Sequence, residues 1–451
     1  MTADIQETAE DAVRYAMKLG PSDCDVVVTD STFLAAEIEK GSMKQSSSAT
    51  DPGVGIRAYV KGCSGFAFCT SFDQRAIKKS AELAVSQARA GTPDSDFKKL
   101  PDKVKPTRVP GLFDPAVSRL SSDEVVSLAI ELADLAGDDK RITSVNANVG
   151  IGLGAAALAN SRGFSGVQKL SFFDAGAEMV AKAGSVMFSG VDSESSRRFD
   201  RKVVRKVAAN AREHAIMGLK QTTIKTGDYP VVIDPIAFGF ILATAVGDGA
   251  NAESVQRRRS YLAGKLGQAI GNDAFTIADD PTIEWGAGSF SFDGEGVPAK
   301  KKAVFERGVL RSYLYDSYAA GKDGVESTGN CSRGGALWSF RRPPGISSSN
   351  LVFKNGGSSL DKMIGETKSG VYLRITYDYP NLATGEFSGL MMESYAIRKG
   401  DLGPALKQST IGIGLFDLMN RIDMVGRDSR EIYGVVAPPV RISSARVAGS
   451  A

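Results

Sequence analysis

The side chains best placed for chemistry lie in a stretch of strand, turn and helix over residues 229–249. Residues 229–233 form a short β-branched run, which predicts a buried strand. Pro235 suits the first turn of a helix, because an N–H there would have no helical partner, and apolar residues recur behind it at helical spacing. Thr244 and Asp248 are the polar groups of this helix and share a face at i and i+4. Two oxygen ligands are too few for a hard cation, so we expect a hydrogen bond at the helix end.

Four other groups of side chains carry reactive or charged atoms. Cys331 could be a nucleophile, but the chain has one histidine, His214, and it lies in a distant segment that supplies no nearby base. Asp293 and Glu295 could act as paired carboxylates, but in a glycine-rich turn we expect them to be exposed charges. The arginines at 257–259 indicate a solvated loop. The residues by themselves therefore identify no catalytic group and no metal or cofactor site.

Composition limits the class of protein. A chain of 451 residues can hold two or three domains with ample core. Its 55 basic and 52 acidic residues leave a net charge of +3, which says little about partners. No apolar run approaches membrane-spanning length, and the N-terminus lacks a basic-then-apolar signal peptide. The four cysteines lack Cys-x-x-Cys spacing, so neither a disulfide framework nor a zinc knuckle is indicated. We expect a cytoplasmic protein that does not enter the membrane.

An N-terminal α/β domain and linker are predicted for residues 1–105. An amphipathic helix should span residues 2–19, and Asp73 should cap a second helix that runs to about residue 90. Between them we expect two strands, a polar connection and a hairpin around Lys61 and Gly62, and the residues assigned to these are 24–29, 33–38, 46–53, 54–60 and 64–70. A linker rich in Pro, Lys and Asp should follow.

A middle α+β segment is predicted for residues 106–225. Ser121 and Glu124 form a capping box that should open a helix to about residue 136. Strands are expected at 144–151, 155–159 and 168–173, with a hairpin turn at 160–163. A helix over residues 200–217 carries a basic side and should contain His214. A basic face could contact nucleic acid, but such faces are usually only solvated, and no groove-binding element is present.

Residues 226–451 should form a mainly β C-terminal domain. Glycine content and strand-like alternation rise from residue 226, and the helix at 235–249 is the one strongly apolar helix of this part. The predicted fold class is therefore α+β, with hairpins and flanking helices in an α/β N-terminal region, followed by a β domain around one buried helix.

The helix segment resembles the zinc site of the TldD/PmbA family, proteins once called modulators of DNA gyrase. In the proteolytic member of that family the segment reads approximately Leu-His-Glu-Ala-Val-Gly-His-Gly. Here residues 242–249 read Leu-Ala-Thr-Ala-Val-Gly-Asp-Gly. The resemblance places Ala243 and Asp248 at the two zinc-binding histidines and Thr244 at the catalytic glutamate. It also places Val425 at the position of the third zinc ligand, which is a cysteine in the proteolytic member. Valine cannot bind zinc.

Other segments extend the resemblance over nearly the whole chain. Near the N-terminus these are Gly55 and Arg57, then Gly62, residues 65–67 and Thr70, followed by an alanine-rich helix. The middle part contributes the turn at 160–163, and the C-terminal part contributes residues 383–388 and 410–414. No single match is specific, and their order and spacing identify the family.

The resemblance implies a function without catalysis in this chain. All three zinc ligands and the general base are replaced, as in the TldE (PmbA) subunit, which pairs with the proteolytic subunit TldD. We therefore expect a non-catalytic subunit of a zinc metalloprotease for unfolded peptides, with zinc and the catalytic glutamate supplied by a TldD-like partner. On this reading the chain holds an extended peptide by β-augmentation and meets its partner through a large interface.

Two other functions stay open from the sequence. The chain could instead form a homodimer that binds peptides or acts as a scaffold without proteolysis. It could also be a hydrolase with non-zinc chemistry, in which case activity should depend on Cys331.

Overall fold

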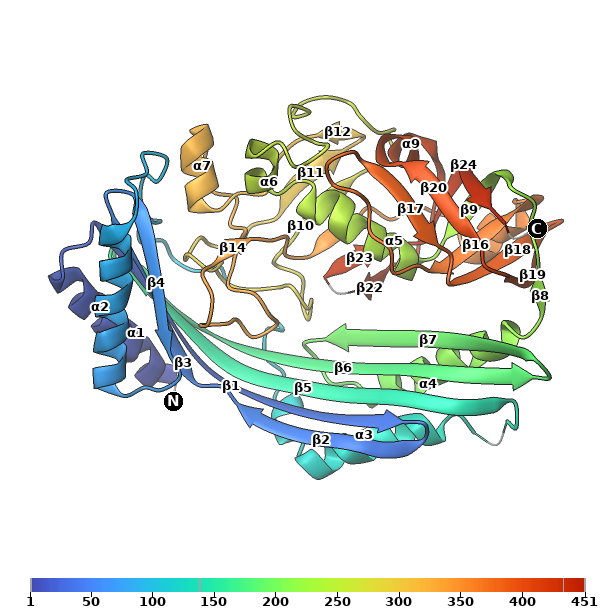
Figure 1. The fold of residues 1–451 in the computed structure, drawn as a ribbon, viewed down its shortest axis with the longest axis horizontal. Helices are drawn as coiled ribbons and strands as arrows, with labels where there is room; N and C mark the ends of the chain where they lie inside the picture. The colour runs from blue at the N-terminus through green and yellow to red at the C-terminus, as the bar shows by residue number, and fades with distance from the viewer. Residues whose placement is uncertain (1, 138, 433, 450–451) are drawn as a thin grey trace.

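A long, curved antiparallel sheet of seven strands forms the N-terminal half of the molecule (Figure 1). The structure is a computed structural model that describes residues 2–137, 139–432 and 434–449. The order in the sheet is β4-β3-β1-β5-β6-β7, with β2 also paired to β1. The strands are β1 Asp23–Glu39, β2 Ser42–Thr50, β3 Gly53–Val60, β4 Cys63–Cys69, β5 Ile142–Asn160, β6 Ser165–Ala183 and β7 Val186–Ser196. Strands from the first and second sequence segments thus share one sheet.

Four helices cover one face of this sheet, namely α1 Thr2–Lys18, α2 Gln74–Ala90, α3 Ser122–Asp134 and α4 Arg201–Met217. Side chains alternate between the two faces of a strand, so the odd-numbered residues of β6, such as Phe173 and Ala175, pack into one core with α3 and α4. The even-numbered residues of β6 therefore face the C-terminal domain. Asp73, Ser121 and Asp200 cap α2, α3 and α4 through their side chains, which confirms these predicted helix starts.

Several strand predictions were wrong in length. The strands expected at 24–29 and 33–38 are one strand, β1, and those expected at 144–151 and 155–159 are also one strand, β5. The polar connection expected at 46–53 lies largely in β2, whose nine side chains are all exposed. Its backbone pairs with β1 while both faces of the strand meet solvent, so the sequence shows no apolar alternation. Strand β7 was missed.

The C-terminal domain contains two larger sheets and a two-stranded ribbon. The nine-stranded sheet consists of β8 Gln221–Thr222, β9 Gly227–Ile233, β16 Ser369–Ile375, β17 Glu386–Leu390, β18 Glu393–Arg398, β19 Asp401–Leu406, β20 Thr410–Gly414, β21 Ile422–Val425 and β24 Val440–Ala448. The six-stranded sheet consists of β10 Ile277–Asp279, β11 Lys302–Glu306, β12 Val309–Leu310, β15 Leu351–Phe353, β22 Arg430–Ile432 and β23 Val435–Ala437. The ribbon pairs β13 Cys331–Ser332 with β14 Gly345–Ile346. Shorter helices are η1 Val117–Arg119, α6 Ala252–Gln256, α7 Ser317–Asp323, α8 Leu360–Gly365 and α9 Leu415–Arg421.

One buried helix, α5 Pro235–Leu242, packs against both large sheets of this domain. Asp234 caps it, and Pro235 occupies its first turn, which confirms the prediction made for Pro235. The same core cluster contains residues of α5 and of strands in both sheets, which confirms a β domain around one helix and the α+β class. The helix does not remain α-helical to residue 249. Residues Ala243–Asp248 form a π-helical turn, η2, in which the N–H of Gly249 donates to the carbonyl of Thr244 at 3.0 Å. No helix among the described residues is long and apolar enough to cross a membrane.

Gly65 in β4 gives a test of this packing. A Cβ there would overlap the backbone carbonyl of Ala84 in α2, so Gly65→Ala must separate the helix from the sheet. We expect it to lower the free energy of unfolding by about 1–3 kcal/mol, measured by urea denaturation. The matched control is Gly412→Ala in β20, where a Cβ meets no atom within 4 Å. Equal effects of the two substitutions would show that the close contact between α2 and β4 is wrong.

Candidate functional site

The positions matched to the family's zinc site do not form a zinc-binding set. Ala243 and Thr244 lie in η2 with Asp248 at its end, and the Thr244 side chain is hydrogen-bonded to the Asp248 carboxylate, as predicted for the helix end. Partial burial raises the pKa of Asp248 despite this bond. Val425 ends β21 and, like Ala243, packs against the main core of the C-terminal domain. One carboxylate and one hydroxyl cannot replace the three or four N, S or O ligands of protein-bound zinc, so these residues do not fit the metal.

A buried ionic network joins the N-terminal sheet to the C-terminal domain. Arg57 of β3 contacts Asp25 of β1 through Nε at 2.9 Å and Glu295 through Nη2 at 2.8 Å. Arg333 contacts the other oxygen of Asp25 at 2.6 Å. All four side chains are almost completely buried. Glu295 was expected to be exposed, and that prediction was wrong, because its turn is covered by the sheet and its charge is matched by Arg57. The family-like Arg57 is thus a structural residue.

Asp293 and Cys331 lie beside this network, also buried. One oxygen of Asp293 accepts the N–H groups of Glu295 and Val297, and the other accepts the N–H of Cys331. Burial and the neighbouring Glu295 charge raise the pKa of Asp293 to about 7. Asp293 was also expected to be exposed, which the structure contradicts. Burial raises the pKa of the Cys331 thiol well above its ordinary value, so the thiolate that a nucleophile needs is disfavoured.

The two remaining groups considered in the sequence are His214 and the arginines at 257–259. His214 lies on α4 as predicted, with Nδ1 2.6 Å from a carboxylate oxygen of Glu393 in β18. This contact ties a helix of the sheet layer to the C-terminal domain. The arginines at 257–259 are exposed, which confirms the prediction of a solvated loop.

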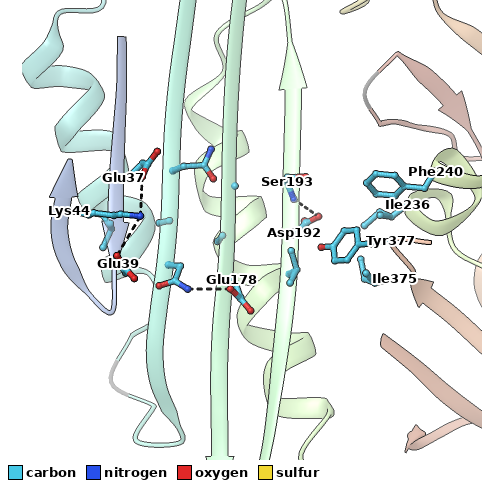
Figure 2. A pocket seen from close by; sticks show the side chains of 17 residues that line it. Glu37, Glu39, Lys44, Glu178, Asp192, Ser193, Ile236, Phe240, Ile375 and Tyr377 are labelled. Atoms are coloured by element: carbon cyan, nitrogen blue, oxygen red, sulfur yellow. Dashed lines mark hydrogen bonds and ion pairs between the residues drawn. The ribbon is translucent and has the colours of Figure 1, made fainter. Parts of the chain in front are cut away.

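A cleft lies between the sheet and the C-terminal domain. Its first section has a volume of about 500 Å³ and is lined on one side by strands β1, β2, β5, β6 and β7. The opposite wall is apolar and consists of Ile236 and Phe240 from α5 with Ile375 and Tyr377 from the end of β16 and beyond (Figure 2). Phe240 and Tyr377 meet edge to face, with ring centroids 5.7 Å apart.

The cleft continues beyond this section. A second section shares Asn148, Gly176 and Ser193 with the first and adds Asp174 and Glu431. A third, of about 650 Å³, shares Phe172 and Ser195 with the second and reaches Arg197 and the ribbon β13-β14. Gly247 of η2 closely approaches Ser348, which lines the third section. The helix that carries the family's zinc-site positions therefore runs along this cleft.

Two carboxylates on β6 form part of the cleft wall on the sheet. Asn146 donates to Glu178 at 3.2 Å, and Asn148 donates to Asp174 at 2.9 Å. A Cβ at Gly150, which pairs with Asp174 across the strands, would overlap its carboxylate, so this glycine provides the space for the charge. Partial burial raises the pKa of Asp174 to about 6.

Sequence reasoning missed these cleft residues. The signal was present as alternation in β6, where apolar Phe173, Ala175 and Ala177 are separated by polar or small residues. It shows that one face of β6 is polar, but only the structure shows that a second domain covers that face and leaves a cleft there.

Models of three protein domains match the chain in sequence order. They describe the PmbA/TldA metallopeptidase domain 1 at residues 24–88, the central domain at 115–219 and the C-terminal domain at 226–449. A metalloprotease of Methanothermobacter thermautotrophicus is 28% identical over 98% of this chain and 97% of its own length. The metalloprotease PmbA of Escherichia coli O157:H7 is 26% identical over 98% of this chain and 96% of its own.

Solved structures agree with these matches. A protein of Thermotoga maritima, described as a proposed modulator of a DNA gyrase, superposes with a TM-score of 0.88 at 25% identity and covers 98% of this chain and 99% of its own. TldE from Thermococcus kodakarensis superposes with a TM-score of 0.89 at 22% identity over 98% of this chain and 99% of its own, which shows a shared fold.

Asp174 gives a pH test of the cleft geometry. Its pKa in the folded state, about 6, lies above the ordinary 3.8, so the folded protein keeps a proton that the unfolded chain loses between these pH values. The wild type should therefore lose stability from this group as the pH rises from 4 to 6. Asp174→Asn removes this loss and should stabilise the protein by about 1–3 kcal/mol at pH 7.5 and not at pH 4. Thermal unfolding at the two pH values measures the difference.

The matched control for this test is Asp134→Asn on the exposed end of α3. It removes one charge on the opposite side of the sheet and should change the melting temperature little at either pH. A destabilised Asp174→Asn protein at pH 7.5 would contradict the assignment of Asp174 as a desolvated and uncompensated charge.

Proposed function

The chain belongs to the PmbA/TldA metallopeptidase family, also called TldD/PmbA, and from this we propose that it is the non-catalytic subunit of a two-chain zinc metalloprotease. The family carries the metalloprotease role, and several curated relatives bear that name. In this proposal the TldD-like partner supplies the zinc, the catalytic glutamate and the attacking water. This chain supplies the walls that hold an extended peptide in the cytoplasm.

The observation that carries the proposal is the donor set at the family's metal positions. Ala243, Thr244, Asp248 and Val425 offer one carboxylate, one hydroxyl and two side chains without a donor. Among the described residues no three His, Cys, Asp or Glu side chains come together as a metal-binding group. Zinc hydrolases need three protein ligands and a base near the bound water. A chain with this fold and without these groups fits a subunit that binds and positions.

The cleft can hold an extended peptide. Strand β7 is the last strand of the seven-stranded sheet, so its outer edge is not paired by a further strand of that sheet. Residues 191–193 of β7 line the first cleft section, but the carbonyls of Val191 and Ser193 accept hydrogen bonds from Arg374 and Arg430, so an added strand would pair with other residues of this edge or displace these arginines. An extended peptide can add to such an edge through main-chain hydrogen bonds, while its side chains enter pockets on the two sides. Ile236, Phe240 and Tyr377 would contact apolar parts of those side chains.

The first experiment separates this proposal from the alternatives of a homodimeric scaffold and a non-zinc hydrolase. We expect the purified chain to contain much less than one zinc per chain, to cleave no unfolded peptide alone, and to support cleavage when mixed with a TldD-type catalytic subunit. Zinc is measured by atomic emission and cleavage by mass spectrometry. Cleavage by the chain alone that is lost in Cys331→Ala would favour the non-zinc hydrolase. A stable homodimer that never activates a catalytic subunit would favour the scaffold.

A second experiment tests the four matched positions themselves. The triple variant Ala243→His, Asp248→His and Val425→Cys restores the ligand types of the proteolytic member, so it should bind about one zinc per chain, because His and Cys at these positions complete a three-ligand set. The control variant Ala243→Asn, Asp248→Asn and Val425→Ser changes the same positions without zinc ligands of that kind. A folded triple variant that binds no more zinc than the control would show that these positions were matched wrongly.

A further inference from the structure

Four of the carboxylates that line the cleft have a cation from the chain itself. Glu37 and Glu39 lie 3.6 and 3.5 Å from the ammonium group of Lys44. Asp192 contacts Arg430 at 2.5 Å and is 3.8 Å from Arg374. Glu194 contacts Lys206 at 2.6 Å. The chain thus compensates these charges.

Among the described residues, four other carboxylates of the same cleft have no such cation; one of them, Asp293, is buried and held by the backbone N–H groups of Glu295, Val297 and Cys331. In the part of the chain that the structure describes, no Lys, Arg or His nitrogen forms an ion pair with Asp174, Glu178 or Glu431. Asp174 and Glu178 receive only asparagine amides on the sheet side, and Glu431 accepts the backbone N–H of Ala287 on the facing wall. Burial raises the pKa of Asp174 and of Glu431, although the charge of Arg197 acts in the opposite direction on Glu431.

The uncompensated charges and the apolar wall together define the chemistry of an occupant. A lysine or arginine side chain has a long apolar stem and a cationic end, so its stem can lie on Phe240 and Tyr377 while its charge reaches the carboxylates. A single metal ion fits less well, because no three His, Cys, Asp or Glu side chains of the described residues come together to bind one. A nucleic acid would place phosphates against these carboxylates and be repelled.

We propose that this cleft selects extended peptide segments that carry basic side chains, which pair with Asp174, Glu178 and Glu431. The proposal rests on the function given above, in which this chain holds the peptide, and it names the peptide chemistry that the cleft prefers. Asp174 and Glu178 lie four residues apart on one face of β6, so basic residues at alternate positions of an added strand can face them in turn.

The test measures peptide binding by the full chain alone. Three fluorescent ten-residue peptides alternate Thr with Lys, Gln or Glu, and fluorescence anisotropy gives the Kd of each at low and physiological salt. The Lys peptide should bind at least about tenfold more tightly than the Gln peptide, and the Glu peptide should bind most weakly. The whole chain carries a net charge of +3, so a general electrostatic effect would produce the opposite order.

Substitutions of the cleft carboxylates test whether these residues cause the preference for the Lys peptide. The double variant Asp174→Asn and Glu178→Gln should bring the Lys and Gln peptides to within about twofold of each other. Single variants and circular dichroism exclude a folding defect. The control variant Asp134→Asn and Glu213→Gln removes the same charge from α3 and α4, behind the sheet, and should keep the preference. Equal Kd values for the Lys and Gln peptides in the wild type, or equal loss in both double variants, would overturn the proposal.

Cleavage separates this inference from the proposed function. If the chain with a TldD-type catalytic subunit cleaves Lys and Gln peptides with the same kcat/KM, and the chain alone binds both equally, the charge preference fails and the subunit function stands. If the Lys preference in binding is present but no catalytic subunit is ever activated, the cleft chemistry stands and the subunit function fails.

Discussion

The buried ionic network of Asp25, Arg57, Glu295 and Arg333 fixes how the two halves of the molecule sit together. Two of these residues come from the N-terminal sheet and two from loops of the C-terminal domain, and all are almost completely buried. Removal of one member would leave a buried charge without a partner, which typically costs about 3–5 kcal/mol. The domain is also held by the contact of His214 with Glu393 and by the contacts of Asp192 in β7 with Arg374 and Arg430. The cleft lies beside these attachments, over the part of the sheet face that they leave uncovered.

In the proposed function, this arrangement keeps a metallopeptidase-family fold while the positions matched to the zinc site hold other residues. Helix α5 and the π-helical turn η2 are parts of the domain core, so their apolar side is constrained by packing with both large sheets. Asp248 at the end of the turn is exposed, and Thr244, although buried, is hydrogen-bonded to it. Neither side chain belongs to the apolar core cluster, so the residue types at these two positions can differ while the helix, the cleft and the attachment of the two halves persist. A subunit that only binds and positions peptides needs the helix, the cleft and the attachment of the two halves, and it does not need the zinc ligands.

The sequence predicted features with local causes and missed those that depend on contacts between distant segments. Helix boundaries followed from caps at Asp73, Ser121 and Asp200 and from regular apolar spacing, and the hairpin around Lys61 and Gly62 followed from its turn. Strand β2 was missed because its polar side chains are all exposed and its partner alone determines it. Asp293 and Glu295 look like exposed turn residues until the sheet covers them. The cleft carboxylates were missed for the same reason, since local sequence does not show which strand face a second domain will cover.

Amide hydrogen exchange on the chain together with its catalytic partner and a basic peptide tests the central claim most directly. The claim is that this subunit holds the peptide at the sheet edge and contributes no metal chemistry. It predicts peptide-dependent protection of β7 and of residues 374–377, with no protection of residues 243–248 on addition of zinc to the isolated chain. Zinc-dependent protection of residues 243–248 in the isolated chain, with β7 unaffected by peptide, would contradict it.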